Sequence, residues 1–368
     1  MTIRTIATAL LLLAAGFVNA ADDVKVVRIA SIGALQNGAV LVTSQSGRVQ
    51  SEGWLAYELS KRGVKLEWYP VAAALGGPGF NEALASKTID FASYGDLPSI
   101  IAKSSGVDIK LIVPYGGATH NYLVVGAHNT ATSIRDLKGK RIALQRGRPS
   151  ELPFTRLIKS QGLTIADFKI YNLPPDAGRA ALAAGNVDAF FGGPDAWSLE
   201  DKKVGRILWS TKQSPKNSYS WNSRVDLYTR SEFARNNPRL TELVATAYVK
   251  AAYWVSQNEN FDQVVKIYAR PGVPESAVRR DFAGQDTEWK QRWAPLFDGD
   301  LQQYFDESIQ ISLEKKLIRK SFAATELLDP RFAQAAIRNL QLQGYWTPRA
   351  VAVAATQPRS ATDMTATR

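Results

Sequence analysis

The sequence predicts an α/β protein with two lobes. Strand-like and helix-like segments alternate between residues 24 and 191, a pattern typical of parallel, doubly wound sheets. The chain has 368 residues, enough for two domains of ordinary size that bury their cores without cross-links. In both halves of this region, strands run into a small-residue turn that begins a helix. We therefore expect two α/β lobes with a ligand cleft between them.

The first lobe should begin with a strand over residues 24–32 that ends at Gly33 in the loop GALQNG. A run of glycines and a proline at residues 76–79 is expected to form a turn, because such residues interrupt regular structure. The apolar periodicity predicts further strands at residues 64–71, around Ile89 and Phe91, at 109–115 and at 122–125, and helices at 48–60, 80–86 and 99–103.

The second lobe is predicted from residue 133 onward. Ser133 and Asp136 have the spacing of a capping box that starts a short helix, and Ser150 is expected to cap the next helix, 151–161. A strand at 225–229 could carry the chain back to the first lobe. The remaining predicted elements are strands at 141–145, 167–173 and 187–191 and helices at 176–184, 241–257, 261–269, 275–282 and 301–316.

The first 20 residues match an export signal. Arg4 provides a positive n-region, residues 9–18 form an apolar core, and residues 18–20 fit a small-residue cleavage site. No later apolar run reaches the roughly 18 residues that a membrane span needs. We expect cleavage after Ala20, a periplasmic location and no membrane-embedded segment. Residues 347–368 are rich in Ala, Thr, Ser and Pro without periodicity, which predicts a disordered tail.

The composition excludes several classes of protein. The chain contains no cysteine, so it has no disulfide scaffold, thiol nucleophile or thiolate metal site. Its formal net charge is +11, but the basic residues are scattered and no nucleic-acid-binding motif is present, so we expect no nucleic-acid partner. A positive surface can instead raise the local concentration of an anionic ligand.

Catalytic motifs are lacking. The two histidines, His120 and His128, are eight residues apart, which is not a zinc-binding spacing, and the chain has no nucleophile elbow, phosphate-binding loop or dinucleotide fingerprint. We therefore predict no catalytic residue, metal or cofactor. His120 is expected to be a hydrogen-bond donor to a ligand or an ordinary loop residue. A secreted enzyme on the same fold is the alternative class.

Three strand–turn–helix junctions are candidates for ligand binding: residues 93–96, residues 147–150 and the segment after Pro174 and Pro175. The first N–H groups of a helix have no partner within the helix and attract anions. In doubly wound sheets such strand ends line the crevice where ligands bind. If the two lobes face each other, these turns meet in one cleft. The pattern favours binding of an anion over a reaction.

The segment from Gly77 to about Phe282 resembles the periplasmic substrate-binding proteins of ABC importers for aliphatic sulfonates, nitrate and taurine. The resemblance is carried by five motifs in order: LEWYP, GGPGFNEAL, KTIDFASYGDLPSIIA, DLKGKRIALQRG and YNLPPDAGRAALAAGNVDAFFGGPDAW. It implies a type II periplasmic-binding-protein fold, a monomer without cofactors, and permease subunits as partners. The implied ligand is an organic anion, foremost an alkyl or aryl sulfonate. Alternatives are nitrate, taurine, an aromatic carboxylate and a pyrimidine-like nitrogen compound.

The resemblance also implies domain boundaries and site residues. Lobe one would comprise residues 21–116 and 222–346, and lobe two residues 117–221, with hinges near 115–122 and 221–229. The implied and expected ligand-binding residues are Gly33, Leu35, Gln36, Tyr94, Gly95, Asp96, His120, Asn121, Gly147, Arg148, Ser150, Gly193 and Asp195.

The chain departs from the family pattern at two of these places. Arg148 and Pro149 stand where the family commonly has small hydroxyl residues, and Arg148 could either clamp an oxyanion with its guanidinium fork or be a solvated loop residue. Gly192 and Gly193 should widen the pocket for a ligand larger than taurine or nitrate. We expect Arg179 to be a solvated helix charge or a contact on the lobe surface and not a ligand contact. Asp96 is first a helix cap, and Trp197, Trp221 and Trp254 are expected to be mainly core residues.

Overall fold

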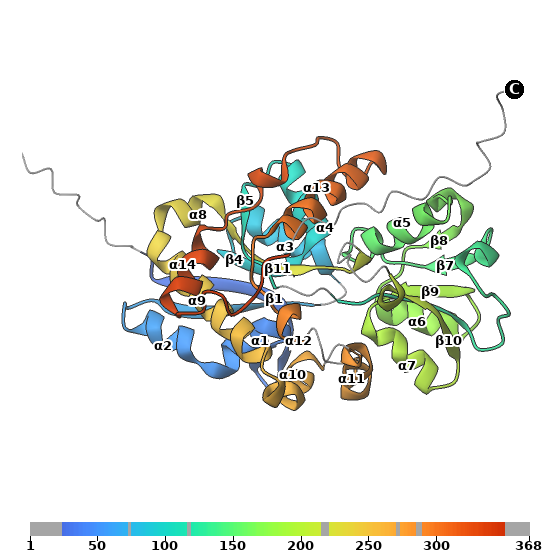
Figure 1. Cartoon of the computed structure of the whole chain (residues 1–368), viewed down its shortest axis with the longest axis horizontal. Helices are drawn as coiled ribbons and strands as arrows, with labels where there is room; N and C mark the ends of the chain where they lie inside the picture. The colour runs from blue at the N-terminus through green and yellow to red at the C-terminus, as the bar shows by residue number, and fades with distance from the viewer. Residues whose placement is uncertain are drawn as a thin grey trace, which may run out of the picture.

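The computed structural model describes residues 24–72, 75–115, 119–214, 221–269, 273–284 and 289–349. The predicted export signal and the predicted tail beyond residue 349 lie outside these residues. Two sheets occupy opposite halves of the molecule, and each is covered by helices (Figure 1). Within the described ranges, no helix has both the length and the hydrophobicity needed to cross a bilayer.

The first sheet has the strand order β3-β1-β4-β11-β5, and β2 forms a hairpin with the end of β1. Strand β1 is parallel to β3 and β4, whereas β11 is antiparallel to β4 and β5. The sheet is therefore mixed and not purely parallel, because β11 enters it from the other half of the molecule. Its strands are β1 (Val26–Gln36), β2 (Ala39–Val42), β3 (Lys65–Val71), β4 (Phe91–Gly95), β5 (Ile109–Val113) and β11 (Val225–Arg230).

The second sheet has the order β10-β6-β9-β7-β8. Strand β7 is parallel to β8 and β9, and β6 is antiparallel to β9 and β10. The edge strand β10 has no counterpart among the predicted strands. The five strands are β6 (Tyr122–Gly126), β7 (Arg141–Ala143), β8 (Lys169–Tyr171), β9 (Ala189–Gly192) and β10 (Gly205–Ser210).

Most predicted helices are present, with shifted ends. The helices are α1 (Ser44–Glu52), α2 (Trp54–Ser60), α3 (Gly76–Ala85), α4 (Asp96–Ser104), α5 (Glu151–Ser160), α6 (Pro175–Ala183), α7 (Trp197–Asp201), α8 (Ser231–Asn236), α9 (Pro238–Val255), α10 (Phe261–Tyr268), α11 (Glu275–Phe282), α12 (Trp289–Arg292), α13 (Gly299–Glu314) and α14 (Arg331–Asn339). The capping box of Ser133 and Asp136 is confirmed, and it starts a short 3₁₀ helix, η1 (Ile134–Leu137).

Three local predictions were wrong. Strand β1 continues past Gly33, because Asn37 and Gly38 adopt positive φ angles of 51° and 79° and turn the chain into β2 as a hairpin. The helix predicted over 48–60 is two helices, since Gly53 has a φ of 72° between them. The glycine run at 76–79 is the first turn of α3 and not a loop before it.

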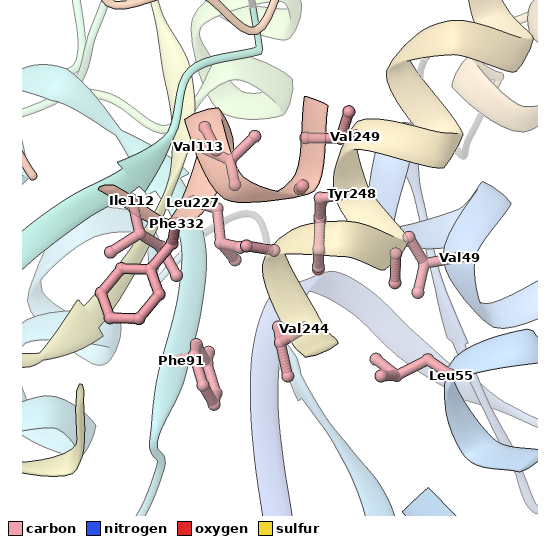
Figure 2. Packing of buried hydrophobic residues seen from close by; sticks show 14 of the residues in the cluster. Val49, Leu55, Phe91, Ile112, Val113, Leu227, Val244, Tyr248, Val249 and Phe332 are labelled. Atoms are coloured by element: carbon pink, nitrogen blue, oxygen red, sulfur yellow. The ribbon is translucent and has the colours of Figure 1, made fainter. Parts of the chain in front are cut away.

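The long helix α9 forms the centre of the core on one face of the first sheet. Its buried residues recur every three or four positions, which gives the helix one continuous apolar face. Figure 2 shows this packing, in which α9 lies between strand residues and the first two helices. The side chains concerned include Val244, Tyr248 and Val249 of α9, Phe91, Ile112, Val113 and Leu227 of the strands, and Val49 and Leu55 of α1 and α2.

The two halves are joined by two chain segments that pair with each other. The backbone N–H of Thr119 donates to the carbonyl of Ser223 over 2.8 Å, and the N–H of Ser223 donates back over 3.1 Å. The chain passes through Thr119 into β6 of the second sheet and through Ser223 back into β11 of the first. The junction therefore lies between the sheets, next to the ends of β4 and β6.

Candidate functional site

Residues of both halves line one cavity of about 270 Å³ between the two sheets. The strand ends and the turns after them contribute most of its wall, as expected for sheets of this kind. The first sheet contributes the middle of β1 and the end of β4, and the second contributes the ends of β7 and β9. The lining includes Ser31, Ile32, Ser93, Tyr94, Gly95, Thr119, Asn121, Gln145, Arg148, Pro149, Ser150, Phe190, Phe191, Gly193, Asp195 and Ser223.

Four helices begin at this cavity. The first residues of α3, α4 and α6 line it, and so does Ser150, the residue before α5. Each of these helices has nine or ten residues, so each directs the partial positive end of its dipole toward the cavity. A proline without an N–H group lies in the first turn of all four, and the N–H groups of Asp96, Leu97 and Glu151 already form hydrogen bonds within the protein. The helix dipoles make this cavity attractive for an anion before any side chain is considered.

Arg148 lines the cavity and reaches across it. A Cβ atom at Gly76, in the first turn of α3, would overlap with the guanidinium group of Arg148. Gly76 also has a φ of 51°, which favours glycine there. Arg148 thus extends from the second half of the molecule to the start of a helix in the first half, and it is not a solvated loop residue.

The expectation for Arg179 was wrong. This side chain is only 13% exposed and lines the cavity, and its guanidinium group forms ion pairs with Asp195 and Asp176. The reason is the position of α6, whose first turn faces the cavity and carries Asp176 and Arg179 three residues apart. With two carboxylates against one guanidinium group, this cluster has a formal charge of −1, so Arg179 adds no net positive potential to the cavity. Asp195 lines the cavity as part of this pair.

Tyr94 provides a buried hydroxyl group. The residue is 2% exposed, and its ring lies against Phe80 and Tyr228 with centroids 5.1 and 5.0 Å away. Its hydroxyl has no hydrogen-bond partner among the residues that the structure describes, although Tyr94 lines the cavity. Burial raises the pKa of this phenol, so the group stays protonated and can donate. A buried polar group without a partner is unusual and suggests that a ligand supplies one.

Asp96 lies outside the cavity wall. Its carboxylate is fully buried, accepts hydrogen bonds from the N–H groups of Leu97 (2.6 Å) and Arg224 (3.2 Å), and accepts a third from the Tyr304 hydroxyl. Burial raises the pKa of Asp96 to about 6, against the lowering effect of these three donors. Gly95, not Asp96, is the N-cap residue of α4. The structure places Asp96 as an internal anchor between β4, β11 and α13.

His120 also lies behind the wall. Its Nδ1 is 3.3 Å from Oδ1 of Asp281, a buried carboxylate that also accepts a 2.6 Å hydrogen bond from Tyr122 and lies 3.6 Å from Arg292. Burial lowers the pKa of His120, and the carboxylate opposes this effect. Burial alone would raise the pKa of Asp281, but His120, Arg292 and Tyr122 lower it overall. His120 is therefore neither an ordinary loop residue nor part of the cavity lining.

The other predicted site residues divide into two groups. Asn121 lines the cavity, and its amide group is held by the Thr119 carbonyl and the Ser223 hydroxyl at 3.1 and 3.0 Å. Tyr94, Gly95, Arg148, Ser150, Gly193 and Asp195 line it as well. Gly33, Leu35, Gln36 and Gly147 do not. The first three belong to the β1–β2 hairpin, where Leu35 is 68% exposed.

Sequence reasoning missed one side of the cavity. Tyr268, Val278, Asp281, Phe282, Arg292 and Trp293 from the region of α10, α11 and α12 line it. These helices were predicted in part, but no site residue was assigned to them. The available signal was the density of aromatic residues between positions 261 and 293. Within the described ranges, no group of three or more histidine and acidic residues could hold a metal ion.

Comparisons with known proteins agree with this geometry. Residues 59–260 match the model of the NMT1/THI5-like family. A solved structure of a periplasmic sulfonate-binding protein, SsuA, from Methylobacillus flagellatus KT is 42% identical with a TM-score of 0.79, covering 89% of this chain and 98% of its own. A Bacillus subtilis protein named as an aliphatic sulfonates-binding protein is 25% identical over 90% of this chain and 95% of its own length.

A solved structure of the desulfurization enzyme DSZB shares the fold with a TM-score of 0.63 at 17% identity, over 86% of this chain and 99% of its own. This level of identity supports the fold and no more. The family match covers more than half of the chain, and the two sheets with the cavity between them correspond to the predicted two-lobed fold. The chain therefore belongs to the NMT1/THI5-like family and has the fold of periplasmic binding proteins.

Proposed function

We propose that this chain is the solute-binding component of an ABC importer and that it carries an organic sulfonate in the cavity between its sheets. The observation that carries the proposal is the convergence of Arg148, the Tyr94 hydroxyl and the positive ends of four helix dipoles on one cavity. The proposal is also supported by the similarity to the Methylobacillus flagellatus protein, which is described as a periplasmic sulfonate-binding protein. That similarity covers 89% of this chain.

The donors of the cavity suit the chemistry of a sulfonate. A sulfonate spreads one negative charge over three oxygen atoms, each of which accepts hydrogen bonds. The guanidinium group of Arg148 can donate to two of them in its fork geometry, and the Tyr94 hydroxyl can donate to the third. The positive ends of the helix dipoles favour the negative charge of the group. A nitrate ion would satisfy the same donors but would fill only a small part of 270 Å³.

Binding without a reaction is the simpler role for these residues. The chain has no cysteine, which removes a thiol nucleophile from the possible chemistry. The nearest titratable groups are committed to partners: Asp195 and Asp176 to Arg179, and Asp281 to His120 and Tyr122. None of these arrangements places a base next to a free nucleophile. We therefore propose a transport protein and not an enzyme.

The same proposal includes location, lobes and partners. We propose that the chain is exported and cleaved after Ala20, and that lobe one (21–116 and 222–346) and lobe two (117–221) close on the ligand as a monomer. The paired segments at Thr119 and Ser223 would then act as the hinge. The closed form would be recognised by permease subunits, because closure converts ligand binding into a change of shape.

The test is isothermal titration calorimetry of the purified protein with methanesulfonate, butanesulfonate, benzenesulfonate, taurine, nitrate and benzoate, followed by mass spectrometry of the recovered ligand. We expect sulfonates to bind and to be recovered unchanged. Arg148→Ala should weaken their binding about 10- to 100-fold, since hydrogen bonds to charged groups contribute about 1.5–3 kcal/mol.

Arg135→Ala is the matched control, because this substitution removes the same charge from the same half of the molecule. Arg135 is exposed and does not line the cavity. Its affinity for sulfonates should equal that of the wild type. The proposal fails if no sulfonate binds while nitrate or benzoate does, or if a converted compound is recovered.

A further inference from the structure

Three aromatic rings form one wall of the cavity. Tyr268 ends α10, Phe282 ends α11 and Trp293 follows α12, and all three line the cavity. Each ring contacts the other two, with centroid distances of 5.5 Å for Tyr268–Trp293, 5.6 Å for Tyr268–Phe282 and 5.9 Å for Phe282–Trp293. We call these three residues the aromatic wall. In Figure 1 its helices lie at the gap between the two halves of the molecule.

The aromatic wall is held in place by Arg292, which lines the cavity beside it, and by a buried cluster. The guanidinium group of Arg292 lies 5.0 Å from the ring centre of Phe282 and 5.5 Å from that of Trp293, and it is 3.6 Å from the carboxylate of Asp281. Phe282 and Trp293 also belong to a buried cluster with Val264, Val265 and Trp289. Because these contacts fix the rings before a ligand arrives, little side-chain entropy is lost on binding.

The wall contains a hydrogen-bond donor that no described residue satisfies. Trp293 is 2% exposed, and its indole Nε1–H has no acceptor among the residues of the described ranges. A buried indole N–H usually finds a partner, and leaving such a group unsatisfied costs about 1–3 kcal/mol. Since Trp293 lines the cavity, a ligand can supply the acceptor.

The volume of the cavity fits an aromatic ligand. A cavity of about 150 Å³ lined by apolar side chains holds one benzene molecule. The present cavity measures about 270 Å³, so a benzene ring, its sulfonate and one small substituent can be accommodated together. Aromatic rings gain about 0.5–1.5 kcal/mol beyond area burial when they pack edge-to-face or offset on other rings.

We infer that the preferred ligand is an arylsulfonate that carries a hydrogen-bond acceptor on its ring, with the ring against Tyr268, Phe282 and Trp293 and the acceptor bonded to Nε1–H of Trp293. This inference rests on the function proposed above, which supplies the sulfonate and its position at Arg148. The inference adds the chemical class of the organic group that carries the sulfonate. Aliphatic sulfonates are expected to bind more weakly, because they lack the ring contacts and lose more internal freedom.

The experiment compares matched ligands by calorimetry. Benzenesulfonate and hexanesulfonate have the same number of carbon atoms and differ in the ring. The 3- and 4-methoxybenzenesulfonates differ from the 3- and 4-ethylbenzenesulfonates only by an oxygen atom in place of a methylene group. Each pair is titrated into the wild type, into Trp293→Phe and into Trp209→Phe. Trp209 is the control, because it is a partly buried tryptophan of β10 that neither lines the cavity nor belongs to the buried cluster of the aromatic wall.

For the wild type we expect benzenesulfonate to bind about 10-fold more tightly than hexanesulfonate. One methoxy isomer should bind about 5-fold more tightly than its ethyl counterpart, the value of one neutral hydrogen bond. Trp293→Phe should remove the methoxy preference while keeping the preference for the ring, and Trp209→Phe should keep both. The two ligand comparisons on the wild type test the inference even if Trp293→Phe does not fold.

The outcomes separate this inference from the function on which it rests. If hexanesulfonate binds as tightly as benzenesulfonate, the aromatic class is wrong and the sulfonate-binding function stands. If neither methoxy isomer is preferred, or if the preference persists in Trp293→Phe, the role of Trp293 is wrong. If no sulfonate binds at all, the proposed function itself fails.

Discussion

At the scale of single residues, Asp96 has the most unusual environment in the first half. Its carboxylate is fully buried, accepts three hydrogen bonds and lies near the ion pair of Arg224 and Asp226, in which the closest N–O distance is 2.9 Å. Burial disfavours the charged form more than the three donors favour it, so the pKa rises from 3.8 to about 6. Between pH 3.8 and about pH 6, the carboxyl group of Asp96 is therefore protonated in the folded chain and ionised in the unfolded chain.

Asp96→Asn should therefore change how stability depends on pH. Because the folded-state pKa of Asp96 is above the unfolded value, its contribution to stability is greatest below pH 4 and decreases as the pH rises through 6. The free energy of unfolding of the wild type minus that of the variant should fall by on the order of 3 kcal/mol between pH 4 and pH 7. Urea titrations of both proteins at several pH values measure this difference in the free energy of unfolding.

Asp136→Asn is the control for this experiment. The N–H groups of Thr132 and Ser133 lower the pKa of this exposed carboxyl, so its contribution to stability is constant above about pH 4 and is lost only below that pH. Its difference curve should be flat between pH 4 and pH 7. A flat curve for Asp96→Asn as well would show that the three donors compensate for burial.

At the scale of elements, α11 is docked on the second half although the chain reaches it from the first. The carboxylate of Asp281 binds His120 and Tyr122, which begin the second sheet. Arg280 forms ion pairs with Glu200 and Asp201 of α7 and lies 3.8 Å from the ring centre of Trp197. Figure 1 shows α11 beside α7. The C-terminal helices therefore hold the two halves together on this side of the cavity.

Tyr122→Phe tests this attachment. The variant removes one 2.6 Å hydrogen bond to the buried carboxylate of Asp281 and changes no volume in the core. We expect the free energy of unfolding to fall by about 1.5–3 kcal/mol, the usual contribution of a hydrogen bond to a charged group. Amide hydrogen exchange in α11 should become faster, because the helix loses a fixed contact with the second sheet.

Tyr57→Phe is the matched control, since Tyr57 is 63% exposed on α2. It should leave both the stability and the exchange of α11 unchanged. If Tyr122→Phe behaved like this control, the docking of α11 would depend on Arg280 and not on the cluster around Asp281.

At the scale of the whole molecule, the two halves also touch on the opposite side of the cavity. Leu97, Leu152 and Ile311 form a small apolar cluster from α4, α5 and α13. Arg156 of α5 is 7% exposed and donates a 2.9 Å hydrogen bond to the Ser308 hydroxyl of α13. The two halves are therefore in contact on both sides of the cavity.

Gly95→Ala should prevent this close approach. Gly95 has a φ of −77°, which alanine adopts readily, but its Cβ would overlap with the ring of Pro149 from the other half. We expect the variant to fold, to have a larger radius of gyration by small-angle X-ray scattering in the presence of benzenesulfonate, and to bind this ligand about 10-fold more weakly, because closure completes the cavity.

Gly126→Ala serves as the comparison, because no atom lies within 4 Å of the position of its Cβ and its φ is not positive. It should scatter and bind as the wild type does. Unchanged affinity and scattering of Gly95→Ala would contradict the idea that contact between Gly95 and Pro149 is needed for binding.

The sequence by itself determined the local elements and three of the turns at the cavity, which are those at residues 93–96, at residues 147–150 and after Pro174 and Pro175. Periodicity of apolar residues and caps depend on neighbours within one or two helical turns, so β4, α5, α9 and the box of Ser133 and Asp136 could be predicted. The junctions that contain Gly95 and Ser150 were predicted for the same reason, since a strand followed by a small-residue turn and a helix has a known geometry.

Only the tertiary structure decided which residues meet. The antiparallel entry of β11, the position of Arg179 at the cavity and the aromatic wall depend on contacts between residues that are far apart in the chain. A periodic pattern shows that a face is buried but not what it is buried against. The same limit applies to Asp96: its sequence context indicates a helix start, while its burial beneath Tyr304 decides that it is an anchor and not a ligand contact.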